Sequence, residues 1–137
     1  MIKSNRHVRP VRARFADAIA LCLLLLSACS NTMESHPVDP DLARDTLDAV
    51  LTSWQAGATP ESWQQKTPSV VVQDMDWKSG RKLKSFEVIE PTEAVDANLH
   101  CQVKLVFEDP EKGEMEQTVK YVVGTSPVLT VFRFVEM

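Results

Sequence analysis

Asp74 and Asp76 are the first residues of this chain whose type and spacing could do chemistry. They stand in Val70–Trp77, where a β-branched start followed by alternating residues predicts a strand with both acids on one face. Paired carboxylates can supply a general base or bind a hard cation. Two acids on one strand face more commonly mark a solvated edge, and we favour that interpretation.

Arg133 lies between Phe132 and Phe134 in the most apolar strand that the sequence predicts. A cation at such a position needs a partner, because burying an unpaired charge is costly. The guanidinium could pair with Asp74 or Asp76 on a neighbouring strand, or it could hold the carboxylate of a ligand. We favour the structural pair.

His100 is the remaining candidate base. It alternates with the apolar residues of its strand, so we expect its side chain to face solvent. No group of His, Cys and acidic residues in the sequence has the spacing of a metal site. The sequence also lacks a Gly-rich phosphate loop and a nucleophile elbow. We therefore expect no metal and no cofactor.

Cys29 is the candidate for covalent modification. It follows an apolar stretch, Ala18–Leu26, that is too short to cross a bilayer as a permanent helix, and this stretch follows a basic region. The basic residues are Lys3, Arg6, Arg9, Arg12 and Arg14. The run Leu26-Ser27-Ala28-Cys29 resembles the lipobox of bacterial lipoproteins. That resemblance implies cleavage before Cys29, a diacylglycerol on its sulfur, and usually a fatty acyl group such as palmitate on the new amine.

The expected location that follows is the cell envelope. Residues 1–28 are then a signal peptide that is removed, residues 29–38 a lipidated cysteine with a flexible tether, and residues 39–137 a single domain. Two or three acyl chains anchor a protein stably. The domain is thus expected in the periplasm or at the cell surface, tied to the outer or inner membrane. The alternative is an ordinary secretory signal cut near Ala28, which leaves Cys29 as a free thiol.

Charge and cysteine content narrow the functions open to the mature chain. Residues 1–28 contain 5 of the 15 Lys and Arg residues and 1 of the 19 Asp and Glu residues, so residues 29–137 keep 10 basic and 18 acidic side chains. Such an acidic domain is poorly suited to binding nucleic acid. Cys101 is the one cysteine left besides Cys29, so we expect no internal disulfide and a buried, apolar role for Cys101.

Two helices and about five strands are predicted to position these residues. Asp39-Pro40-Asp41 predicts a helix start and Gly57 its end. The apolar face of this helix comprises Leu42, Leu47, Val50, Leu51 and Trp54. A short second helix is expected at Pro60–Gln65 with Trp63 directed inward. The strands are expected at Val70–Trp77, Leu83–Glu90, Leu99–Glu108, Met115–Val123 and Val128–Val135, with a polar loop at Pro91–Ala97 and with Trp77 in the core.

This order of elements over residues 40–137 resembles the cystatin-like superfold, and especially its nuclear transport factor 2-like and SnoaL-like members. The resemblance implies an α+β fold in which the N-terminal helix packs on a bent antiparallel sheet of about five strands. SnoaL-like enzymes place an acid or a histidine at the mouth of the cone between helix and sheet. By that resemblance the catalytic candidates are Asp74, Asp76 and His100, and the ligand-binding candidates are Arg133 and Tyr121.

The chain departs from these families at two places. Lys78-Ser79-Gly80 leaves little room for the extra helices that many pocket-bearing members insert. The run Gln117-Thr118-Val119-Lys120 continues into Tyr121 rather than Gly, so the protease-inhibitor motif of true cystatins is not present.

The leading functional hypothesis is therefore a lipid-anchored, non-catalytic binding or assembly module of the cell envelope. Its expected partners are the membrane, through the lipid, and either an envelope protein or a second copy of the chain, because the last strand is apolar on both faces. The alternative hypothesis is a small cofactor-independent SnoaL-like enzyme, of isomerase or hydrolase type. An enzyme needs an enclosed pocket where at least two ionisable groups converge.

Overall fold

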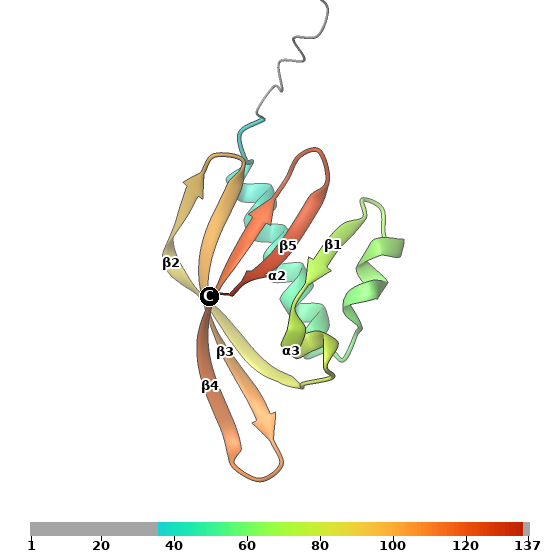
Figure 1. Cartoon of the computed structure of the whole chain (residues 1–137), viewed down its shortest axis with the longest axis vertical. Helices are drawn as coiled ribbons and strands as arrows, with labels where there is room; N and C mark the ends of the chain where they lie inside the picture. The colour runs from blue at the N-terminus through green and yellow to red at the C-terminus, as the bar shows by residue number, and fades with distance from the viewer. Residues whose placement is uncertain (1–35, 136–137) are drawn as a thin grey trace, which may run out of the picture. The chain divides into compact units, whose positions relative to one another are not determined.

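The helix α2 (Pro40–Gln55) lies across one face of a five-stranded sheet in the computed structural model, which describes residues 36–135 (Figure 1). Its predicted start is confirmed, because the Asp39 side chain accepts a hydrogen bond from the Leu42 N–H at 3.0 Å. Its predicted end is confirmed as well, since Gly57 adopts a φ of 89° next to the cap residue Ala56. Leu42 lies in the first turn and is exposed, although the sequence predicts it on the buried face.

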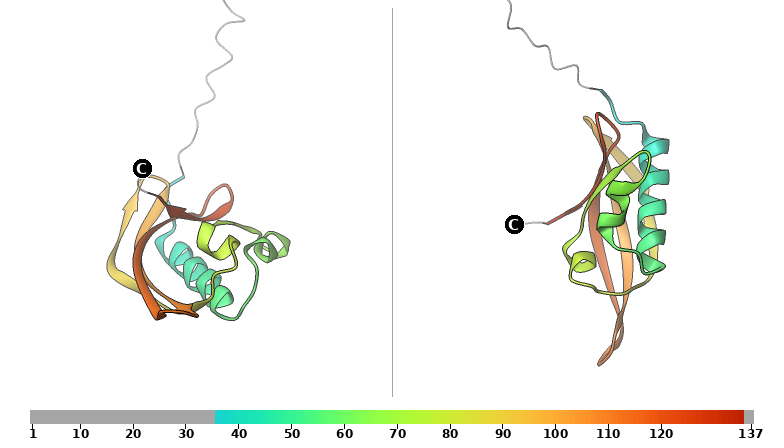
Figure 2. Two further views of the ribbon diagram at one scale, coloured as in Figure 1. Left: turned by 60° about the horizontal axis from the view of Figure 1, so that its bottom comes forward. Right: turned by 90° about the vertical axis from the view of Figure 1, so that its right-hand side faces the viewer.

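The sheet contains β1 (Val70–Gln73), β2 (Leu83–Val95), β3 (Asn98–Asp109), β4 (Gly113–Gly124) and β5 (Leu129–Phe134), in the order β1-β5-β4-β3-β2. The α+β class and the five strands are confirmed. The sheet is mixed rather than wholly antiparallel, because β1 runs parallel to β5. The chain leaves β1 at one edge and returns as β2 at the opposite edge, so the segment between them is a crossover and not a hairpin (Figures 1 and 2).

Two predicted boundaries differ from the structure. β1 ends at Gln73 instead of continuing to Trp77, because Asp74 caps a one-turn helix, α3 (Met75–Lys78). β2 continues to Val95 through the segment predicted as a polar loop, and a register shift between Ile89 and Glu93 accommodates Pro91. The short second helix is confirmed as the 3-10 helix η2 (Pro60–Gln65).

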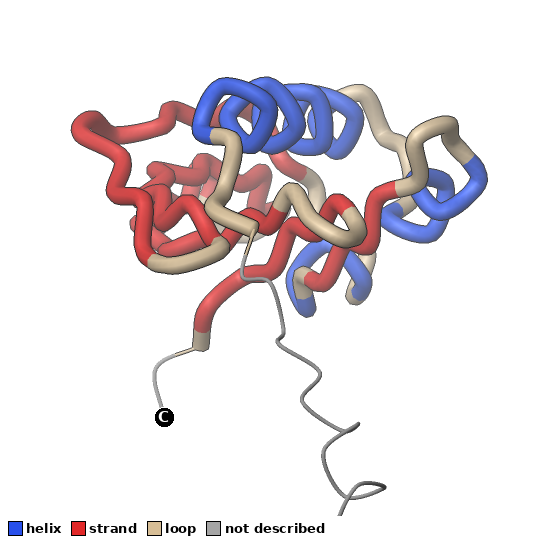
Figure 3. The backbone as a smooth tube through the Cα atoms, turned by 90° about the horizontal axis from the view of Figure 1, so that it is seen from above, coloured by secondary structure: helices blue, strands red, loops and turns tan. Residues whose placement is uncertain are grey.

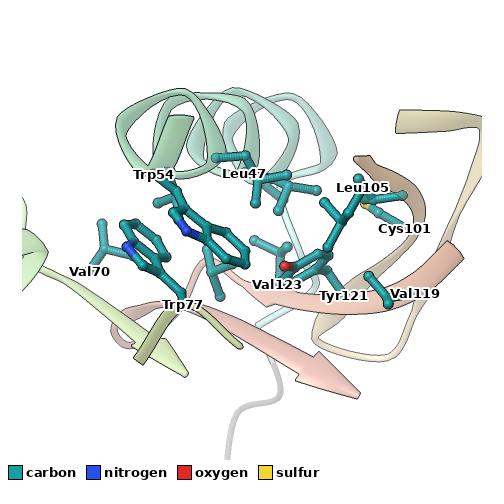
Figure 4. Close-up of a cluster of buried hydrophobic side chains, with 14 of the residues drawn as sticks. Leu47, Trp54, Val70, Trp77, Cys101, Leu105, Val119, Tyr121 and Val123 are labelled. Atoms are coloured by element: carbon teal, nitrogen blue, oxygen red, sulfur yellow. The ribbon is translucent and has the colours of Figure 1, made fainter. Parts of the chain in front are cut away.

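The core lies between α2 and the facing side of the sheet (Figures 3 and 4). Trp54 of α2 stacks on Trp77 of α3, with ring centroids 5.2 Å apart and planes within 5° of parallel. Each of the three tryptophan N–H groups donates a hydrogen bond, that of Trp54 to the Arg81 carbonyl at 2.8 Å. The predicted core positions of Trp63 and Trp77 are thus confirmed.

Cys101 is buried on the core face of β3, as the alternation predicts. Burial raises the pKa of its thiol to about 11. In the unfolded chain the pKa of a cysteine thiol is about 8.5. Because the pKa of Cys101 is higher in the folded chain, the thiol favours the fold fully below about pH 8.5, and this contribution to stability is lost as the pH rises toward 11.

Cys101 should therefore resist a disulfide reagent at pH 8 and react only when the protein unfolds. The chain carries Cys22→Ser and Cys29→Ser, and the measurement is the rate at which Cys101 displaces the leaving thiol of the reagent, with and without denaturant. Burial and the raised pKa both withhold the thiolate, so we expect a slowing of at least about 100-fold in the folded chain. Reaction at the same rate in both states would show that Cys101 is accessible.

Candidate functional site

Asp74 is the buried centre of the candidate site. Its carboxylate caps α3 by accepting hydrogen bonds from the N–H groups of Asp76 at 2.9 Å and Trp77 at 3.2 Å. The same oxygen lies 3.4 Å from Nη1 of Arg133, and the second oxygen accepts the hydroxyl of Tyr121. The side chain is only 1% exposed. Four donors thus satisfy a carboxylate that would otherwise be costly to bury.

Arg133 reaches this centre because of the register of the sheet. It stands opposite Tyr121 in the β4–β5 ladder, so both side chains lie on the core face. Its guanidinium forms ion pairs with Asp74 and Asp76. The predicted structural pairing is confirmed, but the two acids come from the cap and first turn of α3 and not from the face of a strand.

Asp76 extends the cluster to the start of β2. Its carboxylate lies 3.4 Å from Nη1 of Arg81, whose guanidinium also lies over the Phe107 ring at 3.8 Å. The cluster thereby balances two carboxylates with two guanidinium groups. We call Asp74, Asp76, Arg81, Tyr121 and Arg133 the Asp74 cluster.

The protonation of the cluster is fixed by burial and by its charges. Burial, followed by the charge of Asp74 and the hydrogen bond to it, raises the pKa of Tyr121 far above its ordinary value. Burial alone would lower the pKa of Arg133, but the hydrogen bond to Asp76 and the charges of both acids outweigh it, so the pKa of Arg133 is raised. Tyr121 is therefore held as a neutral donor and Arg133 as a cation.

His100 does not join the Asp74 cluster. In the β3–β4 ladder, Cys101 stands opposite Tyr121, and both lie on the core face of the sheet. His100 precedes Cys101 and stands opposite Val122, so it lies on the other face. His100 is half-buried there. The sheet therefore separates it from Asp74 and Asp76, and these three catalytic candidates do not converge.

An open cavity of about 1140 Å³ adjoins the cluster. Asp74, Asp76 and Arg133 line it, together with η2 and the edge of β4 at Gln117–Lys120. Phe134, the last residue of β5, and Val135 after it also line the cavity. Lys78 and Glu61 also border the cavity. We call this cavity the β4 groove.

Sequence reasoning missed Lys78, Lys120 and Glu61 as groove residues. They are ordinary polar residues of a helix, a strand and a 3-10 helix, and none has a motif that marks it. To predict these groove residues, one would have to know that β5 pairs with only the last part of β4 and ends where β4 continues. The predicted strands Met115–Val123 and Val128–Val135 are nearly equal in length, so the sequence pattern hides this difference.

Within residues 36–135, no group of three or more His, Cys, Asp or Glu side chains is placed to hold a metal ion. In the same part of the chain, no helix is long and apolar enough to cross a membrane.

Comparison with known proteins gives no family for the chain: no family model, no curated protein and no solved structure matches it. The arrangement of a helix on a five-stranded sheet is compatible with a cystatin-like fold.

Replacing Asp74 by alanine should lower the free energy of unfolding by about 3–5 kcal/mol, because it removes a helix cap and one partner of a buried ion pair. Tyr121→Phe should cost about 1–3 kcal/mol, since it leaves a buried carboxylate oxygen without its donor. Glu87→Gln is the control, because Glu87 is exposed and Nζ of Lys104 lies 3.7 Å away, and it should change stability by less than about 0.5 kcal/mol. Urea titration measures the free energy of unfolding of all three variants. An equal loss of stability in Tyr121→Phe and Glu87→Gln would contradict the role of the cluster.

Tyr121 is the only tyrosine of the chain, so its ionisation can be followed by absorbance. Its folded pKa lies above the unfolded value of about 10, so it stabilises the fold below pH 10 and loses this contribution as the pH rises above 10. We expect no tyrosinate absorbance in the folded protein at pH 10, and its appearance together with loss of the circular dichroism signal at higher pH. A titration with a midpoint near pH 10 in a chain that stays folded would refute this expectation.

Proposed function

We propose that the chain is a lipid-anchored protein of the cell envelope whose domain binds a partner without catalysis. The observation that carries the proposal is the run Leu26-Ser27-Ala28-Cys29 behind a basic region and a short apolar stretch. This run lies outside the described residues, so the anchor is inferred from sequence. In the proposal, Cys29 holds the lipid and the preceding segment is removed as a signal.

The state of the Asp74 cluster supports a non-catalytic role. A general base needs a carboxylate that is able to accept a proton from substrate. The carboxylate of Asp74 instead accepts hydrogen bonds from four donors, and that of Asp76 forms ion pairs with two guanidinium groups. These contacts join α3 to β4 and β5, which is what a structural cluster does.

The β3–β4 hairpin extends away from the first described residues of the domain. The described chain begins at His36, and the Asp39 N–H donates to the Thr125 hydroxyl at 3.0 Å, beside the β4–β5 loop. From that end β4 and β3 extend as a hairpin to the opposite end of the domain (Figure 1). A strand of 12 residues spans about 40 Å.

One observation favours a second candidate function. Asp74, Asp76 and Arg133 line a cavity, as a small SnoaL-like enzyme would require. That cavity is an open groove rather than an enclosed pocket, and His100 lies on the other face of the sheet. The enzyme therefore remains the alternative.

The anchor is tested by metabolic labelling with an alkyne fatty acid. The wild-type chain should take up label and partition with membranes, whereas Cys29→Ser should take up no label, because the thioether that precedes cleavage cannot form. Cys22→Ser is the matched control, since it removes a cysteine within the segment expected to be cleaved, and it should be labelled as well as wild type. A wild-type chain that is exported and carries no label would overturn the anchor.

The binding role is tested separately by crosslinking in intact cells. Photo-crosslinkers at Thr118 or Lys120, in the β4 groove, should capture a protein partner or a second copy of the chain. A crosslinker at Glu87, which is exposed on β2 and does not line the groove, should capture it less. Crosslinking that is equal at all surface positions would contradict a specific binding face.

A further inference from the structure

Part of β4 forms an edge of the sheet that has no second strand. β4 pairs with β3 along its whole length, from Gly113 to Gly124, but with β5 only from Lys120 to Gly124. Among residues 36–135, no strand pairs with the other side of Gly113–Val119. We call this segment the β4 edge. Every second residue of such an edge directs its N–H and C=O away from the sheet, where another strand can bind them.

The other two edges of the sheet are protected. β1 is a four-residue strand that packs against η2. β2 contains Pro91, which has no N–H, and two register shifts interrupt its ladder. The β4 edge has no proline, and its ladder with β3 is continuous from Asn98↔Gly124 to Asp109↔Gly113. It is thus regular in the way that pairing with another strand requires.

The β4 groove supplies side-chain contacts where this edge begins. Val119, Phe134 and Val135 give it an apolar portion, and Phe134 and Val135 are 50% and 67% exposed. The acids Asp74 and Asp76 are engaged within the Asp74 cluster and are not available to a ligand. Lys78 and Lys120 border the groove and form no ion pair with any described residue. These two cations stand out in a domain that is acidic as a whole.

We propose that the β4 edge binds an extended segment of a partner protein in which acidic and apolar residues alternate. The segment adds a strand beside Gly113–Val119, in line with the end of β5. Backbone hydrogen bonds to β4 provide the pairing. Lys120 stands opposite Phe134 in the β4–β5 ladder, on the face of the sheet away from the core, whereas Val119 lies on the core face. The apolar side chains of the segment therefore contact Val119 and Val135 on the core face, and its carboxylates approach Lys120 on the other face, while Lys78 adds its charge at the border of the groove. This inference rests on the proposed binding role, which it makes specific, and is independent of the lipid anchor.

The probe is a fluorescent octapeptide of alternating Val and Glu, titrated against the full chain in detergent micelles and followed by anisotropy. Two further peptides carry N-methyl groups on every Val or on every Glu. A strand added to an edge uses the N–H groups of alternate residues, so one methylated peptide should bind at least about tenfold more weakly and the other within about threefold of the parent. Amide hydrogen exchange should slow at alternate residues of the β4 edge when the parent peptide is added.

Three charge variants test the recognition of acidic residues. Lys78→Glu and Lys120→Glu should each weaken binding by about three- to tenfold. Lys82→Glu is the matched control, because Lys82 is exposed, carries the same charge and does not border the β4 groove, and its affinity should stay within about twofold of wild type. An octapeptide of alternating Val and Lys should bind more weakly than the Glu peptide.

Several results would overturn the proposal. Equal binding of both methylated peptides would mean that charge alone recruits the probe. Protection of the β4 edge that rises with protein concentration in the absence of peptide would mean that a second copy occupies it. No peptide binding in a chain that captures a partner in cells would refute this inference and leave the proposed binding role standing. Peptide binding in a chain that takes up no fatty acid would refute only the anchor.

Discussion

The burial of one carboxylate, that of Asp74, is the constraint on which the arrangement of this domain depends. An acid this far from water is tolerable only if its acceptor positions are filled, and the donors come from three separate elements: α3, β4 and β5. Filling them requires β5 to lie beside β4 in the register that aligns Arg133 with Tyr121. The apolar core is shared by all the elements, but the need of the Asp74 carboxylate for donors is met only when β4 and β5 are adjacent.

Sequence reasoning succeeded where the physical cause is local. Asp39, Pro40 and Gly57 define the ends of α2 by their own backbone preferences, and the alternation in β3 assigns Cys101 to the core. The need of Arg133 for an acidic partner also follows from its sequence neighbours alone. These inferences required no knowledge of which strands are adjacent.

The remaining features depend on interactions between distant residues. The sequence Asp74-Met75-Asp76-Trp77 alternates like a strand, but a capping carboxylate stabilised from β4 and β5 turns it into a helical turn. The parallel pairing of β1 with β5 follows from the order of strands across the whole sheet, which no local pattern specifies. The β4 groove exists because β5 is six residues long and β4 twelve, and strand length in a sheet is set by pairing rather than by composition.

The parallel pair also determines when the domain can fold. β1 is hydrogen-bonded to β5 alone, and more than fifty residues separate the partners along the chain, from Val70 to Leu129. Closing so long a loop is entropically unfavourable until the intervening strands have assembled. β1 therefore has no strand to pair with until β5 has been synthesised. Loss of β5 would thus remove two strands from the sheet rather than one, because β1 pairs with no other strand.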